Sequence, residues 1–202
     1  MKKLMILGAG GHGKVAADIA RLCGYQEIAF LDDNPSLTAW EGYPVLGSLD
    51  QVAEYPDWEF FVAIGNCGTR EQLLCKLIEE GRQIATLLHP GAIIAQSAMI
   101  GKGSIVTAGA VINPSAVIGQ GCIINTCASV DHDCIVEDFC HISVGSHLSG
   151  TVHIGSRTLL GIGAVVSNNL TVCQGCTIGA GAVVVDDICQ PGTYLGVPAK
   201  KQ

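Results

Sequence analysis

Aromatic and charged side chains are scarce in this 202-residue chain, at 5% and 14%, and no apolar run is long enough to span a bilayer. The first apolar run, residues 4–7, stops at a glycine-rich segment, too early for a signal peptide. The formal net charge of −7 argues against a nucleic-acid partner. We therefore expect a cytoplasmic protein that neither crosses a membrane nor binds nucleic acid.

A six-residue repeat fills the second half of the chain. Every sixth position from 94 to 184 is aliphatic, without a break, and the position four residues later is mostly Ala, Ser or Cys. A short fixed period is typical of a solenoid, and hexapeptide repeats predict a parallel β-helix. Three hexads, or eighteen residues, would form one triangular coil.

The ten cysteines fit this repeat better than a disulfide framework. Cys122, Cys134, Cys140 and Cys176 fall in the small slot, where Cys acts as a small hydrophobic residue. Only Cys173 and Cys176 have CxxC spacing, and no second pair accompanies them. Reduced thiols are expected, as in a cytosolic protein.

Residues 1–90 are predicted to form a separate Rossmann-like α/β domain, followed by the β-helix at 91–202. Strands are expected at 4–7, 28–31, 45–47, 59–64 and 84–88, and helices at 14–23 and 69–80. This alternation predicts a parallel sheet with helices on its faces. The domain has the size of one half of a doubly wound fold, which suits one nucleotide rather than a dinucleotide.

Residues 8–13 match G-x-G-x-x-G between an expected strand and an expected helix, and Asp32 ends the next strand. The amide groups at a helix N-terminus bind phosphate. A tight turn that binds nothing is the alternative. His12 within the loop and the Asp32-Asp33 pair favour a nucleotide or a nucleotide-linked sugar.

His132 is the strongest candidate for acid–base chemistry. It stands at a corner of the repeat between Asp131 and Asp133, and a carboxylate that binds one ring nitrogen raises the basicity of the other. A solvated polar corner is the alternative. Three more histidines, at 141, 147 and 153, are six residues apart and face three directions, so no metal site is expected within one chain.

These motifs resemble the hexapeptide-repeat acyltransferases. With the glycine-loop domain in front, the whole chain resembles the sialic-acid O-acetyltransferase and nucleotide-amino-sugar N-acetyltransferase family (NeuD/PglD-like). The resemblance rests on residues 8–13, 30–33, 63–66, 125–134 and 196–200. It implies a left-handed β-helix, a homotrimer and acetyl-CoA as the donor.

The resemblance also assigns residues. His132 matches the catalytic base and Asp133 the acid beside it; some members have Glu there, so Asp131 is a possible substitute. The positions that match the sugar-nucleotide site are Gly10, Gly11, His12, Asp32, Asp33 and Gly65. The positions that match the acetyl-CoA site are His141, Ile162 and Ala180, with Lys200 near the phosphates.

The repeat arithmetic places these residues on different faces. Ile162 and Ala180 are eighteen residues apart and stack, whereas His132 lies on another face of the same chain. The active site is therefore expected between subunits. Outward-facing apolar residues also favour a partner chain; they are Ile105, Val111, Val117 and Ile123.

The expected function is transfer of an acetyl group from acetyl-CoA to the amine of a nucleotide-linked sugar, most plausibly a UDP-4-amino-4,6-dideoxy sugar, in glycan biosynthesis. O-acetylation of sialic acid or another hydroxyl acceptor is one alternative. A non-catalytic nucleotide-binding scaffold is another.

Overall fold

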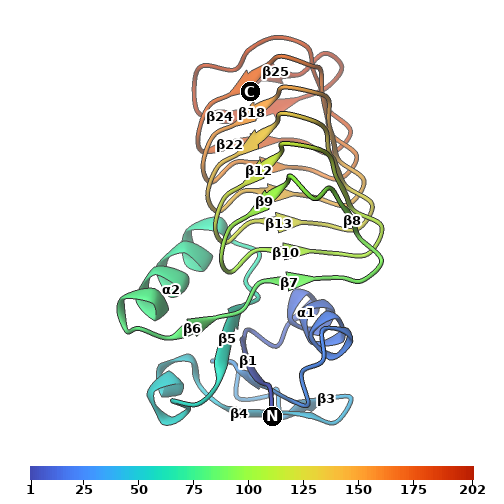
Figure 1. Ribbon diagram of the computed structural model, residues 1–202. Helices are drawn as coiled ribbons and strands as arrows, with labels where there is room; N and C mark the ends of the chain where they lie inside the picture. The colour runs from blue at the N-terminus through green and yellow to red at the C-terminus, as the bar shows by residue number, and fades with distance from the viewer. The chain divides into compact units, whose positions relative to one another are not determined.

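The computed structural model describes residues 1 to 202 and divides into two compact units, Met1–Pro90 and Gly91–Gln202 (Figure 1). None of its helices has both the length and the apolar character needed to cross a membrane.

The first unit is a mostly parallel sheet with helices. Its strands are β1 (Lys3–Leu7), β2 (Glu27–Leu31), β3 (Ala39–Trp40), β4 (Tyr43–Gly47), β5 (Glu59–Val62) and β6 (Gln83–Ile84), in the order β3-β4-β2-β1-β5-β6. Its helices are α1 (Gly11–Leu22), α2 (Cys67–Glu79) and the short 3₁₀ helix η1 (Leu49–Glu54). Since β1 pairs in parallel with β2 and β5, the carboxyl ends of these three strands meet at one edge.

Three local predictions for this unit were wrong. Helix α1 begins at Gly11, inside the glycine loop, rather than at residue 14. The single strand expected at 84–88 is two strands, because β6 pairs with β5 and the chain then leaves that sheet before β7 (Leu87–Leu88). Strand β3 was missed, since two residues show no alternation; it forms an antiparallel hairpin with β4.

Two glycines of the loop are required by packing. Gly8 has a φ of +104°, which L residues rarely adopt. A Cβ on Gly13 would lie 2.1 Å from the Gly8 carbonyl oxygen. A side chain at Gly13 would push α1 away from the end of β1, and one at Gly8 would collide with Ile64 after β5.

The second unit is a triangular parallel β-helix with three faces. Face one contains β10 (Ile105–Val106), β13 (Ile123–Ile124), β16 (His141–Ile142), β19 (Leu159–Leu160), β22 (Cys176–Ile178), β24 (Gly192–Leu195) and β25 (Lys200–Lys201). Face two contains β8 (Ile93–Ile94), β11 (Val111–Ile112), β14 (Ser129–Val130), β17 (His147–Leu148), β20 (Val165–Val166) and β23 (Val183–Val184). Face three contains β9 (Met99–Ile100), β12 (Val117–Ile118), β15 (Ile135–Val136), β18 (His153–Ile154) and β21 (Thr171–Val172).

Each coil has the predicted length. Ile112 pairs with Val130, and Val130 with Leu148, so neighbouring strands on a face are eighteen residues apart. The aliphatic residue of each hexad points inward, and from Val106 to Val184 these side chains are buried. Figure 1 shows the resulting stack of coils.

Every sixth residue from 103 to 181 has a left-handed backbone conformation. Half of these positions are glycine; the others are Ser115, Cys127, Asp133, Phe139, Thr151, Arg157 and Asn169. The corner of each hexad therefore demands this conformation whatever the side chain. Asp and Asn tolerate it better than most residues.

The small inward slot also satisfies backbone carbonyl groups. In six cases a buried hydroxyl or thiol donates to the carbonyl oxygen fifteen residues later, at 2.7 to 3.2 Å; the donors are Ser104, Cys122, Cys134, Cys140, Ser146 and Thr158. No cysteine forms a disulfide. Cys in this slot is thus a hydrogen-bond donor as well as a small hydrophobic residue.

The outward apolar residues differ from expectation. Ile105 and Ile123 are only 0% and 1% exposed, so the prediction that they present an open apolar surface was wrong. Val111 and Val117 are half-buried. Exposed apolar side chains occur instead at Ile162 and elsewhere in the unit.

Replacing Ser146 by Ala should lower the free energy of unfolding by about 0.5–1.5 kcal/mol, because the Gly161 carbonyl loses the hydroxyl donor and keeps only the N–H of Ala164. Ser146→Cys is the matched control, since a thiol donates from this slot in three other hexads, and it should cost clearly less. Urea denaturation at fixed protein concentration measures both. Equal losses in the two variants would contradict the role of the hydrogen bond.

Candidate active site

His132 lies on the turn after β14, at the corner between faces two and three. Its Nδ1 is 2.8 Å from Oδ2 of Asp133, and its side chain is 57% exposed, which leaves room for a substrate. The hydrogen bond to Asp133 raises the pKa of His132, and the charges of Asp131 and Asp133 add to this. The carboxylate fixes the proton on Nδ1, so Nε2 carries the basic lone pair.

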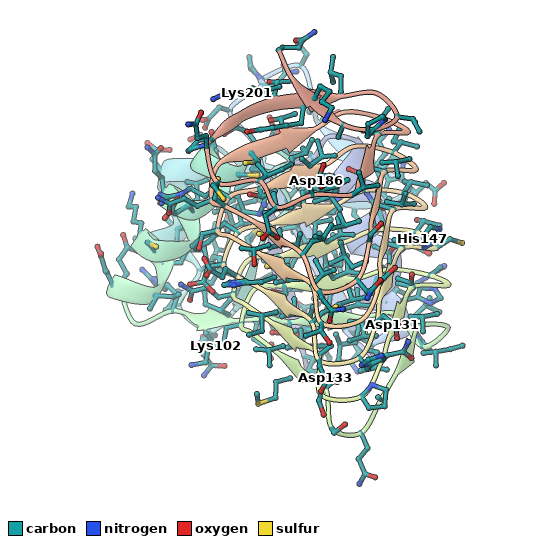
Figure 2. All side chains as sticks on the ribbon, turned by 90° about the horizontal axis from the view of Figure 1, so that it is seen from above. Lys102, Asp131, Asp133, His147, Asp186 and Lys201 are labelled. Carbon is teal, nitrogen blue, oxygen red and sulfur yellow. The ribbon has the colours of Figure 1, made fainter.

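Asp131 hydrogen-bonds to the backbone of His132 and not to its ring. Its Oδ1 accepts hydrogen bonds from the backbone N–H of His132 at 2.8 Å and from Nδ2 of Asn113 at 2.7 Å. These two bonds lower the pKa of Asp131. Asp131 therefore orients the backbone of His132, while Asp133 contacts its imidazole. Figure 2 shows Asp131 and Asp133 side by side on this corner.

Gly150 lies one coil above His132 and was missed by the sequence analysis. A Cβ at this position would come within 2.5 Å of Nε2 of His132, so the imidazole rests on bare backbone. The Gly150 N–H makes no hydrogen bond within the chain. The eighteen-residue period could have predicted this contact, because Gly150 follows His132 by eighteen residues and must stack on it.

The other solenoid histidines are engaged separately. His141 contacts Asn125 at 3.2 Å, His147 contacts Ser129 at 2.8 Å, and His153 contacts Glu137 at 2.8 Å. They lie on faces one, two and three, as the spacing predicted. No group of three or more His, Cys, Asp or Glu side chains in the structure is arranged to hold a metal.

The residues expected to bind the cofactor lie on and beside face one. His141 is in β16, and Ile162 and Ala180 follow β19 and β22 at the corner that leads to face two. Ile162 is 63% exposed, so this corner presents an apolar side chain to solvent. Lys200, in β25, lines a pocket of about 160 Å³ with Tyr194.

Within one chain this corner and His132 are not brought together. The corner that carries Ile162 and Ala180 precedes face two, and the corner that carries His132 follows it. One complete face of the prism separates the two sets.

In the first unit, Gly10, Gly11 and Gly65 line the carboxyl edge of the sheet. No atom lies within 4 Å of a Cβ built on any of them, in contrast to Gly8 and Gly13. Packing does not explain why these three positions are glycine. The bare backbone leaves room for a ligand to approach closely at all three.

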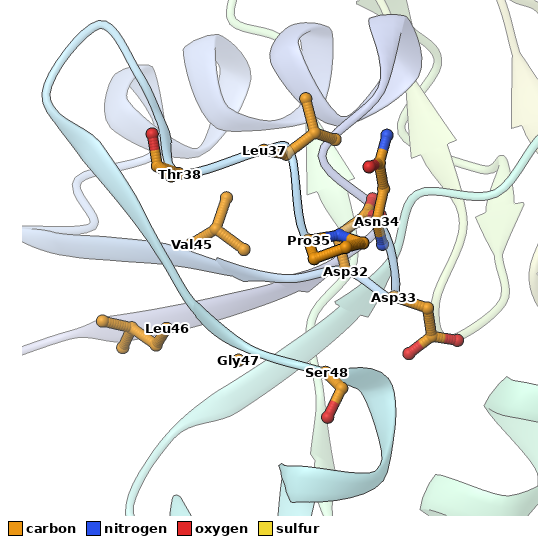
Figure 3. A pocket seen from close by; sticks show the side chains of 10 residues that line it. All are labelled: Asp32, Asp33, Asn34, Pro35, Leu37, Thr38, Val45, Leu46, Gly47 and Ser48. Carbon is orange, nitrogen blue, oxygen red and sulfur yellow. The ribbon is translucent and has the colours of Figure 1, made fainter.

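The two aspartates that follow β2 accept hydrogen bonds from backbone N–H groups. Asp32 accepts from the backbone N–H of Ala9 at 2.7 Å and of Asn34 at 2.8 Å, so it ties the glycine loop to the end of β2. Asp33 accepts from the N–H of Leu49 through one oxygen. A cavity of about 360 Å³ opens beside them and is lined by the loop that follows β2 and by the end of β4 (Figure 3).

His12 stands on the first turn of α1, next to Arg70 of α2. Its Nε2 is buried and has no hydrogen-bond partner. Burial, together with the positive charge of Arg70, lowers the pKa of His12 to about 4, so the ring is neutral at physiological pH. Arg70 is 1% exposed and donates to the carbonyls of Ile64 and Gly65. No pattern in the sequence indicates that this arginine is buried.

Known proteins match both units. A family model described as the PglD N-terminal domain matches residues 3–77. The acetyltransferase domain of PglB from Neisseria gonorrhoeae, solved in complex with acetyl coenzyme A, is 43% identical, with a TM-score of 0.96 and coverage of 100% of this chain and 99% of that chain. The chain belongs to the PglD-like acetyltransferase family.

Two further relatives extend the comparison. PerB from Caulobacter crescentus, solved with CoA and GDP-perosamine, is 38% identical, with a TM-score of 0.94 and coverage of 100% and 98%. UDP-N-acetylbacillosamine N-acetyltransferase of Bacillus subtilis is 35% identical over 113 residues, which span 54% of this chain and 52% of that enzyme. The predicted family is confirmed, and so is the predicted fold of an α/β domain followed by a left-handed β-helix.

Asp133→Asn should move the acidic limb of the kcat/KM profile to lower pH. His132 must be neutral to accept a proton, its raised pKa sets the pH below which activity falls, and Asn removes the carboxylate that raises it. The kcat should fall by less than the about 10²–10⁴-fold that a general base is worth, because His132 itself stays in place. Asn also tolerates the left-handed backbone at this position. An unchanged acidic limb would exclude Asp133 from this role.

Proposed function

We propose that this protein transfers the acetyl group of acetyl-CoA to the amino group of a nucleotide-linked amino sugar, with His132 as the general base. The observation that carries the proposal is the pair formed by His132 and Asp133. The carboxylate holds Nδ1, and Nε2 faces the bare backbone of Gly150 on an accessible corner.

The proposed transfer is direct. The sugar amine attacks the carbonyl carbon of the thioester while Nε2 of His132 accepts the proton that the amine loses. The carbon–sulfur bond then breaks, and His132 returns the proton to the CoA thiolate. A cysteine carrier is not required; the nearest thiol, Cys134, is buried, donates to the Ser149 carbonyl and has a pKa raised by burial.

The oxyanion of the tetrahedral intermediate needs a donor that is already in place. The Gly150 N–H has no partner within the chain, and Gly150 lies against the ring of the proposed base. A backbone amide held by the solenoid costs no reorganisation when the charge develops. We assign the oxyanion interaction to it.

The proposed cofactor site follows the corner of Ile162 and Ala180, with His141 on one side and Lys200 toward the phosphates. An exposed apolar stripe suits the uncharged arm of CoA, and a lysine suits its phosphates. The PglB domain was solved with acetyl-CoA and PerB with CoA, which supports the same ligand here.

The proposed acceptor is held by the first unit. Its phosphates would meet the N-terminus of α1 at Gly10 and Gly11, and its nucleoside would enter the cavity beside Asp33. We favour a UDP-4-amino-4,6-dideoxy sugar, since the Bacillus relative is named for a UDP sugar. GDP-perosamine, the ligand of PerB, is the main alternative.

Active sites between the subunits of a homotrimer complete the proposal. His132 and the corner of Ile162 and Ala180 lie on opposite edges of face two, so a neighbouring chain has to supply one of them. The absence of any disulfide among ten cysteines supports action in the cytoplasm.

Thiol release from acetyl-CoA should be fast with one nucleotide amino sugar in a panel of UDP-linked 4-amino sugars, GDP-perosamine and free sialic acid. A UDP sugar is expected to be the substrate, and the product should carry one N-acetyl group by mass spectrometry. Release with sialic acid alone would replace the proposal by O-acetylation. A chain that binds CoA in calorimetry but reacts with none would contradict the acceptor class, and a chain that binds neither ligand would favour the scaffold.

Two inactive variants should restore activity when mixed. His132→Ala should lower kcat by about 10²–10⁴-fold with CoA binding kept, and Ile162→Trp should block the cofactor corner. In randomly mixed oligomers about one quarter of the shared sites combine an intact His132 from one chain with an intact cofactor corner from the other. His153→Gln is the control and should stay active. Verified mixed oligomers without regained activity would contradict a shared site.

A further inference from the structure

Asn125 follows β13 and lies against the ring of His141 in β16, one coil above. Its Nδ2 is 3.2 Å from Nε2 of His141. Asn125 has no part in the mechanism proposed above, although it is placed on face one beside the corner that would hold acetyl-CoA.

The amide of Asn125 has a defined orientation. Its Oδ1 accepts hydrogen bonds from the backbone N–H of Thr126 at 2.8 Å and from the Thr126 hydroxyl at 3.4 Å. The Thr126 hydroxyl is in turn 3.4 Å from that of Thr107. Since Oδ1 is engaged by these donors, the NH₂ group is the one that faces the imidazole.

The orientation of the amide determines where the ring carries its proton. An amide NH₂ only donates, so Nε2 of His141 has to accept, and a ring nitrogen accepts only when it is unprotonated. The proton of the neutral ring is then on Nδ1. A proton added to Nε2 would point at the NH₂ group and lose the hydrogen bond.

We propose that Asn125 is a positioning residue that holds His141 as the neutral Nδ1–H tautomer. The inference rests on the proposed function in one respect, that His141 faces acetyl-CoA. There, the fixed tautomer would define which ring atoms donate and which accept beside the uncharged amide-bearing arm of the cofactor.

The other paired histidines provide internal contrasts. His153 faces a carboxylate through Nε2, at 2.8 Å from Oε1 of Glu137, which requires the proton on Nε2. His132 faces Asp133 through Nδ1, which requires the proton there. Of these three pairs, the one at His141 alone has an obligatory donor facing the ring nitrogen, so Nε2 there accepts through its lone pair.

Nitrogen-15 NMR of the histidine rings tests the tautomer without any ligand. At a pH where the rings are neutral, His141 should show a protonated Nδ1 and an unprotonated Nε2, and His153 the reverse. Asn125→Asp is isosteric but presents only acceptors, so the proton of His141 should move to Nε2. Asn169→Asp, the same change at an exposed corner, should leave the His141 signals unchanged. His141→Gln identifies those signals by their loss.

Kinetics test the functional part. Asn125→Asp should raise the KM for acetyl-CoA by about three- to tenfold, the factor that one hydrogen bond is worth, with a smaller change in the KM for the acceptor. A wild-type ring protonated on Nε2, or no shift in Asn125→Asp, would overturn the inference. A shifted tautomer with an unchanged KM for acetyl-CoA would overturn its link to the cofactor. A wild-type protein that does not bind acetyl-CoA would refute the proposed function instead, since NMR measures the tautomer without any ligand.

Discussion

Backbone hydrogen bonds between successive coils hold the second unit in register, and the candidate site depends on that register. Asp131 N–H donates to the Leu148 carbonyl at 3.1 Å, and Ser149 N–H to that of Val166 at 3.1 Å. Each residue therefore stands directly below the one eighteen positions later. The hydrogen bonds that stabilise the solenoid therefore also place Gly150 against His132. Errors of one residue would move every inward side chain outward, so the register is strongly specified.

The corners add a second constraint, the left-handed residue in each hexad. At most corners this position is glycine or a small polar residue, and at the candidate site it is Asp133. The backbone conformation turns the carboxylate back toward the preceding residue, which is His132. The acid and the base are thus neighbours in sequence, yet they meet through a turn that the whole solenoid imposes. A pair built on such a rigid scaffold is held within the narrow tolerance that proton transfer requires.

The sequence predicted the solenoid well because its signal is repeated at every hexad. It predicted the α/β unit less sharply: α1 begins earlier than expected, and the hairpin of β3 carries no pattern. The residues alone did not distinguish Asp131 from Asp133, since both flank His132. The family resemblance favoured Asp133, which is the aspartate that contacts the ring. Arg70 was missed because burial of a charged residue in a helix depends on nearby carbonyls, which composition does not reveal. The position of Gly150 was predictable, since the eighteen-residue period places it on His132.

The regular rise of the coils would give the proposed cofactor slot a fixed length. Ile162 and Ala180 are one coil apart, and Lys200 lies in β25 beyond them, so the distance between the two ends of the proposed slot is a whole number of strand spacings of about 4.8 Å. Such a slot would change in length only when eighteen residues are gained or lost together, whereas a pocket made of loops can change by small steps. Point mutations would then affect the fit of the acceptor more readily than the length available to an elongated donor.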